Sequence, residues 1–557
     1  MTTSVETRPA TGMSQKNIIL LFIGLMVTML LASLNQTVLS TALPTIVGEL
    51  NGVDQMTWVI TAYILAMTIV MPVYGRISDL LGRKPVILFA ITVFIAGSVV
   101  GALAGNIMWL IVARVIQGLG GGGLMILAQA AIADVVSPRD RGRYMGFMGA
   151  VFAVASVAGP LLGGWLTEGP GWRWAFWLNV PLGALAIVAT IAFMRIPKPQ
   201  HDERPRLDFE GMALIALATT AIVLIGTWGG SQYDWVSPQI IVLIVAAVVL
   251  AVAFVFVEKR AQMPIIPMQL FSRRNFTLTT IAALMVGIAM FGTLGYMPTY
   301  IQMVTGVDAT VAGLYMTPMM GGLLVTSIIS GQIVSRTGRY KVFTLAGAVV
   351  IGLGLWLLSS MHPQTPNWQM CVYLGVFGIG IGLIMQILTL IVQNEFPGAF
   401  VGTATAANNY FRQVGATLGS AVVGSIFTSR LISLLSDRVP QGDGGGLGGG
   451  GEKNLTPSLV NSLPDAIRGP VVESYNDALL PIFLFFVPLA VIALIVMAFV
   501  DEKPLSTKVR GEAEVEGLGE GQVLPEPFEI SEPATTGETA DETAAAPRRE
   551  KGDPVDA

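Results

Sequence analysis

Two arginines lie inside stretches that are otherwise long, apolar and free of charge. Arg114 follows the charge-free residues 86–113, and Arg412 interrupts a second such stretch. A guanidinium is costly inside a bilayer and is usually functional there. Gln117 and Gly118 follow Arg114 by three and four residues, so a helix would place all three on one face. The pattern indicates a polar transport site, the alternative being a structural arginine satisfied by backbone carbonyls or water.

Arg412 ends the polar segment Asn408-Asn409-Tyr410-Phe411-Arg412. Its guanidinium could contact an anionic group on a substrate or lipid, or it could serve packing and gating. Aromatic residues and many of the 26 methionines could line an apolar cavity, because methionine adapts to ligands of varied shape. The alternative for each aromatic residue is ordinary packing or contact with lipid. The cavity candidates are Trp58, Tyr63, Tyr296, Tyr410 and Arg412.

One short segment, residues 75–84, combines an acid, bases and two glycines between apolar stretches. Gly75 and Gly82 permit a tight turn and a close approach of helices. Asp79 lies near Arg83 and Lys84 in sequence, and we expect it also to lie near the basic residues 139–143. These charges could form an ionic latch that holds one conformation and breaks in the other. The alternative is that Arg83 and Lys84 only set topology.

Composition places these groups in a membrane protein. The chain has 557 residues, of which 53% are hydrophobic and 12% are charged, whereas a soluble domain carries about 25% charged residues. The single cysteine, Cys371, excludes an internal disulfide and a cysteine metal cluster. The two histidines, His201 and His362, fall in predicted loops and leave little for histidine chemistry.

A spanning helix needs roughly 20 apolar residues. Cutting the apolar runs at proline, glycine and asparagine clusters predicts an all-α integral membrane protein of fourteen helices. The expected helices lie near 17–40, 57–76, 86–105, 107–133, 144–167, 174–195, 211–229, 238–257, 276–299, 310–334, 342–360, 368–393, 403–429 and 477–500.

The chain contains an internal repeat. Residues 331–340 repeat the glycines and bases of the 75–84 segment at the same spacing, with Ser335 in place of the acid. Each copy follows the second helix of a six-helix half, which predicts two bundles with a substrate path between them. The expected divisions are a tail 1–16, a bundle 17–195, a linker with two extra helices 196–275, a bundle 276–500 with a long outer loop 430–476, and a disordered acidic tail 501–557.

The distribution of lysine and arginine predicts the orientation. With the N-terminus in the cytoplasm, the inner loops hold seventeen of these residues and the outer loops hold five. Both termini are then cytoplasmic. The net charge of −4 is a property of the tail: residues 501–557 contain fifteen acidic and six basic residues, so the rest of the chain is basic.

The 75–84 segment also resembles a signature of the major facilitator superfamily, Gly-x-Leu-Ala-Asp-x-x-Gly-Arg-Lys, with Ile77 and Ser78 for the Leu and Ala. The resemblance implies a membrane transporter with two six-helix bundles, and it implies a role in proton transfer for the Arg114 segment. The fifth helix resembles the pattern of antiporters and drug exporters, with Ala155 for its first glycine. The matching residues are Gly159, Pro160, Gly163 and Gly164.

Residues 34–44, 58–63 and 172–181 resemble the fourteen-helix drug–proton antiporter branch of that family. The branch carries an aspartate where this chain has Asn35, followed by Thr37. An amide cannot titrate. The proton could use another acid, the protein could be uncoupled, or Asn35 could mimic a protonated aspartate. Candidate acids at helix ends are Asp134, Glu49, Asp54 and Glu168.

We therefore expect a polyspecific exporter of amphipathic compounds in a bacterial inner membrane, driven by a proton gradient, with no cofactor, metal, nucleic acid or obligatory protein partner. A dedicated exporter or flippase of a metabolite or lipid is the first alternative, because the titratable acid is missing. A membrane sensor or enzyme is the second. The glycines 120–123 lie inside a predicted helix, so they do not favour a nucleotide site.

Overall fold

The computed structural model describes residues 15–50, 52, 55–194, 196, 208–230, 232–396, 398–438, 460, 463–505 and 507. The predicted sites at Asp54, His201 and the glycine run 444–451, and nearly all of the tail 501–557, lie outside these residues. The described chain is helical throughout, apart from loops and one isolated bridge between Gly229 and Tyr233.

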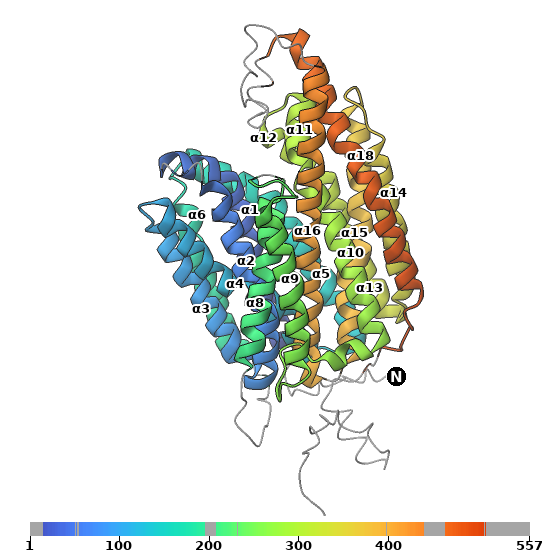
Figure 1. Ribbon diagram of the computed structural model, residues 1–557. Helices are drawn as coiled ribbons and strands as arrows, with labels where there is room; N and C mark the ends of the chain where they lie inside the picture. Colours follow the sequence, from blue (N-terminus) through green and yellow to red (C-terminus); the bar gives the residue numbers. More distant parts are fainter. Residues whose placement is uncertain are drawn as a thin grey trace, which may run out of the picture.

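The helices follow one another as shown in Figure 1. They are α1 (Gln15–Glu49), α2 (Met56–Leu81), α3 (Arg83–Ala102), α4 (Ile107–Val135), α5 (Pro138–Glu168), α6 (Trp174–Trp177), α7 (Asn179–Phe193), α8 (Phe209–Trp228), α9 (Pro238–Glu258), the 3-10 helix η2 (Met268–Ser272), α10 (Arg274–Leu294), α11 (Met297–Thr305), α12 (Ala309–Tyr315), α13 (Thr317–Thr337), α14 (Lys341–Ser359), α15 (Asn367–Glu395), α16 (Gly398–Arg438) and α18 (Asp465–Ala498).

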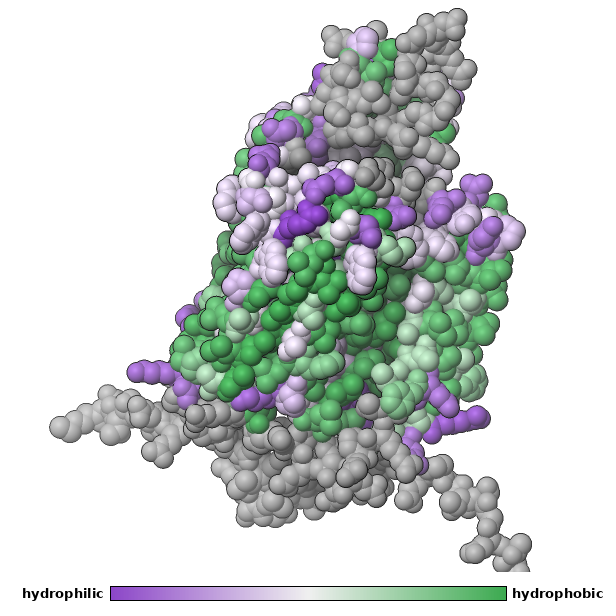
Figure 2. Space-filling model, turned by 90° about the vertical axis from the view of Figure 1, so that its left-hand side faces the viewer, coloured by the Kyte–Doolittle hydropathy of each residue, from purple (hydrophilic) through white to green (hydrophobic). Residues whose placement is uncertain are grey.

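Fourteen helical segments of the described chain are long and apolar enough to cross a membrane, which is the number that the sequence predicts. Helices α6 and α7 together form one of them, as do α10 with α11 and α12 with α13. A broad apolar band covers the face drawn in Figure 2, and polar residues gather toward its two ends. The chain is therefore a multi-pass membrane protein.

The expected second and third helices, near 57–76 and 86–105, leave too long a loop between them. Helix α2 continues to Leu81 and α3 begins at Arg83, so Gly82 alone separates them. Gly82 has a φ of 90°, which a residue with a Cβ rarely adopts. The charged residues of this segment therefore lie on helix ends, where their positions are fixed.

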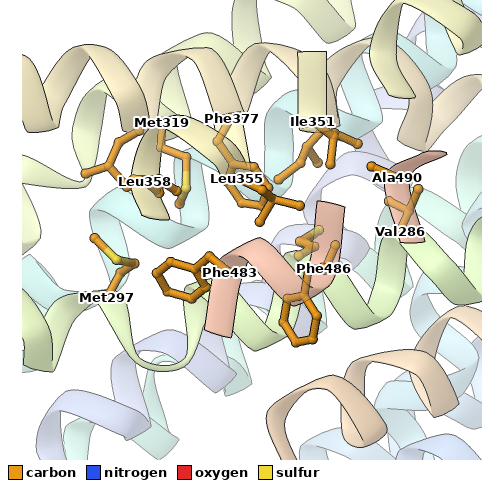
Figure 3. Close-up of a cluster of buried hydrophobic side chains, with 14 of the residues drawn as sticks. Val286, Met297, Met319, Ile351, Leu355, Leu358, Phe377, Phe483, Phe486 and Ala490 are labelled. Atoms are coloured by element: carbon orange, nitrogen blue, oxygen red, sulfur yellow. The ribbon is translucent and has the colours of Figure 1, made fainter. Parts of the chain in front are cut away.

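The N-terminal half, α1–α7, owes its close packing to glycines in α4. A Cβ on Gly118 would lie 2.5 Å from the carbonyl oxygen of Tyr63, and one on Gly122 would lie 2.4 Å from that of Met67. The glycine run is thus the surface on which α2 and α3 pack. In the C-terminal half, α10–α18, large apolar side chains fill the core instead, with Phe377 near Leu355 and Phe483 beside Met297 (Figure 3).

Helices α8 and α9 form a hairpin between the halves in sequence and in space (Figure 1). Helix α8 packs on α2 of one half and on α16 of the other. The Thr219 hydroxyl lies 2.8 Å from the Tyr410 hydroxyl, and the ring of Trp228 meets Trp58 edge-on. The linker therefore lies along the line where α2 and α16 meet.

One end of the bundle carries the α2–α3, α4–α5, α13–α14 and α15–α16 junctions. We call it the basic end, because Arg83, Lys84, Arg139, Arg336 and Lys341 lie there. The other end carries α6, α11 and α12 (Figure 1).

Candidate functional site

The two halves meet at the basic end along two seams. In the first seam, α2 contacts α16, and Asp79 joins them. Its carboxylate accepts hydrogen bonds from the backbone N–H of Gly402 at 3.2 Å, and from the N–H and hydroxyl of Thr403 at 2.7 and 2.6 Å. Charge-assisted bonds to N–H groups near a helix N-terminus are strong, because the helix dipole also favours the anion there. Asp79 therefore fastens α16 to the N-terminal half.

Arg83 holds Asp79 in place. Its guanidinium lies 2.5 Å from Asp79 and 2.8 Å from Asp134 of α4, and it also donates to the hydroxyl of Ser78. Arg83 and Asp79 are buried, with 4% and 6% of their surface exposed. The hydrogen bonds from Gly402, Thr403 and Ser78 add to the ion pairs in offsetting the cost of removing these charges from water. Asp134, which the sequence suggests as a proton site, here helps to hold the Asp79–Arg83 pair.

Gly75 and Gly402 allow this seam to close. A Cβ on Gly75 would lie 2.3 Å from the Cβ of Ala406, and a Cβ on Gly402 would lie 2.2 Å from the Arg83 guanidinium. Lys84 points away from the seam and donates to the carbonyl oxygens of Ile191 and Met194, at 2.8 and 3.1 Å. Lys84 thus ties α3 to the end of α7.

The second seam, between α5 and α13, has Ser335 in the position that corresponds to Asp79, and the Ser335 hydroxyl lies 3.5 Å from an Asp140 carboxylate oxygen. Arg139 donates to the carbonyl oxygens of Ser335 and Arg336, at 3.1 and 2.8 Å. A Cβ on Gly331 would lie 2.2 Å from the Gly142 carbonyl oxygen. Arg139, Arg141 and Arg143 lie in the first turns of α5, and none of them forms an ion pair with Asp79 within 4.0 Å, so the expected contact between these bases and Asp79 is not made in this conformation. Gly331 stands in the second seam where Gly75 stands in the first.

Amides continue the contact between the halves deeper into the bundle. Gln129 of α4 accepts a hydrogen bond from Asn409 at 3.0 Å through its side chain and one from Gln393 at 3.3 Å through its backbone carbonyl. Arg141 donates to the carbonyl oxygen of Gln393 at 3.2 Å. Gln129 and Gln393 were not predicted from the sequence, since isolated glutamines in apolar helices carry no motif. Their burial in charge-free stretches was the available signal.

A separate polar network lies within the N-terminal half around Arg114, which is 1% exposed. The guanidinium donates to the carbonyl oxygen of Val59 at 3.2 Å and to the side-chain oxygen of Gln117 at 2.9 Å, and it lies 4.0 Å from the Tyr63 ring centroid. Gln117 in turn donates to Ser98 at 2.8 Å. No acid of the described chain forms an ion pair with Arg114 within 4.0 Å. Its charge is stabilised by dipoles and a π face.

Asn35 belongs to this network as an acceptor. Its side-chain oxygen receives hydrogen bonds from Gln117 at 3.3 Å and from Asn179 at 3.1 Å. Its side-chain nitrogen and the Tyr63 hydroxyl have no partner in the described chain. The sequence therefore identified Asn35, Gln117 and Arg114 as candidates, and the structure brings these three together. Gly118 lies beside them and provides the contact between α4 and α2.

The fifth-helix motif packs against α1. Thr37 donates its hydroxyl to the Ala155 carbonyl oxygen at 2.9 Å. A Cβ on Gly163 would lie 2.7 Å from the Val38 carbonyl oxygen. Pro160 lies inside α5, one residue after Gly159. The motif thus sets how closely α1 and α5 cross, two residues from Asn35.

Gly159→Ala should destabilise the protein, because its Cβ would lie 2.0 Å from the Thr37 hydroxyl oxygen. Overpacking of this kind costs about 1–3 kcal/mol. Gly164→Ala is the matched control, since a Cβ there meets nothing within 4 Å. Thermal unfolding in detergent should show a lower midpoint for Gly159→Ala only. Equal midpoints for both variants would contradict the tight crossing.

The five predicted cavity residues contact different elements. Trp58 meets Trp228, Tyr63 lies under Arg114, and Tyr410 bonds to Thr219. Tyr296 donates to the Ser420 carbonyl oxygen at 3.2 Å, and Arg412 donates to the side chain of Asn409. In this conformation they do not form one polar cluster.

Of the other candidate acids that the structure describes, Glu49 forms an ion pair and Glu168 is exposed. Glu49 pairs with Arg173 at 2.6 Å and accepts from the Trp172 indole at 2.8 Å, at the end opposite the basic end. Glu168 is exposed at the end of α5. No group of three or more His, Cys, Asp or Glu that could hold a metal occurs in the described ranges.

Comparison with known proteins gives the following matches. A sequence model of the Major Facilitator Superfamily matches residues 25–420. An uncharacterized MFS-type transporter of Mycobacterium tuberculosis is 39% identical over 516 residues, which cover 92% of this chain and 73% of the relative. The Multidrug resistance protein 3 of Bacillus subtilis is 32% identical over 510 residues, covering 90% and 98%.

Among solved structures, the proton:xylose symporter XylE superposes with a TM-score of 0.57 at 14% identity. The match covers 90% of this chain and 100% of the symporter. At that identity the likeness concerns the fold alone, and it agrees with two packed helical halves.

Proposed function

This chain belongs to the Major Facilitator Superfamily, and from that premise we propose that it exports amphipathic small molecules in exchange for protons. The observation that carries the proposal is the double seam at the basic end, where the two halves meet through hydrogen bonds and close glycine contacts. The name of the Bacillus subtilis relative, a multidrug resistance protein, supports the choice of substrate class.

The proposed mechanism is alternating access. Substrate enters between the halves from the cytoplasm or the inner leaflet while the basic end is open. Closure then joins Asp79 to Gly402 and Thr403 and brings Gly142 against Gly331, so the substrate can leave only at the opposite end. The conformation described here has the basic end closed. Reopening requires the Asp79 bonds to break, and inward proton movement would supply the free energy.

Charge at the basic end supports a cytoplasmic location for that end and for both termini. A bacterial inner membrane agrees with the two bacterial relatives. No cofactor is required by this mechanism, since the proton gradient is the energy source. The partners we propose are the lipid bilayer, protons and the transported molecule.

Arg114 and Asn35 have distinct proposed roles. Arg114 carries a buried positive charge close to α1 and α2, and it would favour an anionic or polar group of the substrate when the halves part. Asn35 orients Gln117 and Asn179 by accepting from both, and it cannot carry a proton. Proton exchange in this chain therefore requires a different acid.

Gradient-driven export of an amphipathic dye from vesicles containing the purified chain tests the proposal. We expect export to depend on an imposed pH gradient in the chain with Asn35. Asn35→Asp should export with a similar response to the gradient, because a carboxylate can accept the same hydrogen bonds from Gln117 and Asn179. Dye export in the absence of any response to the gradient would contradict proton exchange.

A dedicated exporter or flippase of a lipid or metabolite is the second candidate. The specific observation in its favour is Asn35, which replaces the titratable acid of the antiporter branch. Failure to move any dye, together with uptake or flipping of an amphipathic lipid in the same vesicles, would favour it.

A further inference from the structure

Two carboxyl groups meet beside the first seam, at the basic end of the linker hairpin. Asp208 caps α8 and accepts a hydrogen bond from the backbone N–H of Gly211 at 2.8 Å. Glu258 ends α9 and accepts from the N–H of Ile265 at 3.1 Å. A Cβ built on Gly211 would lie 2.4 Å from one Asp208 oxygen and 3.0 Å from one Glu258 oxygen, so both groups flank the same point.

Neither group is fully satisfied. Glu258 is 2% exposed, and one oxygen of each carboxyl group is buried without a hydrogen-bond partner in the described chain. Neither forms an ion pair within 4.0 Å with a described Lys or Arg. Asp79, the other buried carboxylate named above, has donors on both oxygens. Two ionised, unpaired carboxylates this close would repel each other and lose hydration, whereas one proton supplies a donor and removes one charge.

Arg76 of α2 connects this pair to the seam. It is 7% exposed, its Nε has no hydrogen-bond partner among the described residues, and its guanidinium lies 5.7 Å from the centroid of the Phe400 ring, near enough to Glu258 and Asp79 for their negative charges to stabilise its own. Arg76 and Asp79 are three residues apart and share a face of α2. The other charges nearby, Glu210, Lys259 and Arg260, are exposed to solvent. Arg76 therefore lies within electrostatic reach of both Glu258 and Asp79.

We propose that Asp208 and Glu258 form a proton-binding carboxyl pair that controls the Asp79 seam through Arg76. With a proton bound, the pair attracts Arg76 less, and the positive charge of Arg76 stabilises Asp79 in the closed seam. When the proton leaves to water, the pair becomes fully ionised, attracts Arg76 more strongly and weakens that support. The transport role of the pair rests on the proposed proton exchange, but the bound proton does not.

Infrared spectroscopy of the purified full chain in lipid tests the bound proton directly. At neutral pH exposed carboxyl groups are ionised, so we expect a band from a protonated carboxyl group that disappears in Glu258→Gln and changes in Asp208→Asn. Asparagine can still cap α8, so Asp208→Asn should fold and provides a test of the band even if Glu258→Gln does not fold. Glu210→Gln, an exposed change on the same helix, should leave the band unaltered. Absence of the band, or its persistence in Glu258→Gln, would overturn the proposal.

A transport assay tests the role of the carboxyl pair separately from the proposed proton-driven export. One-for-one exchange across a pH difference of one unit supports an about tenfold substrate gradient. Glu258→Gln should no longer build that gradient, because the pair can then no longer bind and release the proton, whereas Glu210→Gln should build the same gradient as the unaltered chain. An equal gradient in Glu258→Gln would overturn the transport role. If the unaltered chain builds no gradient, the proton-driven function fails, and the infrared result alone decides whether the pair holds a proton.

Discussion

Replacing Asp79 with asparagine is expected to open the basic end and to abolish export. The amide can still accept one hydrogen bond from α16, but it loses the charge that Arg83 and the start of α16 both stabilise. Breaking a buried charge pair costs about 3–5 kcal/mol, which corresponds to a shift of roughly 10² to 4 × 10³ in the equilibrium between the closed and open conformations. Export should fall below about one tenth of its normal rate, because the closed state is then rarely populated.

Labelling of a cysteine in the first seam measures this opening. Ala406→Cys, in a chain with Cys371→Ser, places a thiol where α16 faces Gly75. A water-soluble maleimide should label it at least about tenfold faster when Asp79→Asn is added. Asp437→Asn, an exposed change near the end of the same helix, is the control. Unchanged labelling in Asp79→Asn would show that Asp79 does not hold the seam.

Gly331→Val should have an effect of similar size at the second seam. Its Cβ would lie 2.2 Å from the Gly142 carbonyl oxygen and 3.3 Å from the Cα of Gly146, both in the other half. Backbone atoms on both sides leave little room for repacking, so the halves must separate there. Because the clash lies between the halves, we expect export to be lost while each half remains folded.

The matched control is Gly321→Val on the same helix, where a Cβ meets nothing within 4 Å. Gly321→Val should export normally. The free energy of unfolding should differ by no more than about 1–3 kcal/mol between the two variants. A difference of that size would show that Gly331→Val blocks transport without unfolding the protein. Normal export by Gly331→Val would mean that the second seam does not close tightly during transport.

The sequence predicted the helical architecture well, because long apolar runs admit few other structures in a membrane. It misjudged the junction at Gly82, where a glycine-rich, charged segment resembled a loop although the two helices nearly touch. A positive φ at one residue is enough for the turn, and the hydrophobic pattern of the sequence does not reveal a one-residue break between two helices.

The candidate site was predictable only in part. Asn35, Gln117 and Arg114 were found because polar groups in apolar helices are conspicuous, and they do meet. The partners of Asp79 were missed, since backbone N–H groups of Gly402 and Thr403 have no sequence signature. Glu258 was missed because it ends an apolar run beside Lys259 and Arg260, where an acid looks like part of a solvated loop.

Alternating access requires the two halves to part at the basic end during each transport cycle. A disulfide between Gly149→Cys and Ser327→Cys, in the Cys371→Ser chain, tests it most directly. A Cβ on Gly149 would lie 2.3 Å from the Ser327 hydroxyl oxygen, so the two sulfurs can reach each other when the basic end is closed. We predict that the oxidised protein exports no dye from vesicles and that reduction restores export. Undiminished export by the fully cross-linked protein would show that the halves need not part at the basic end during transport.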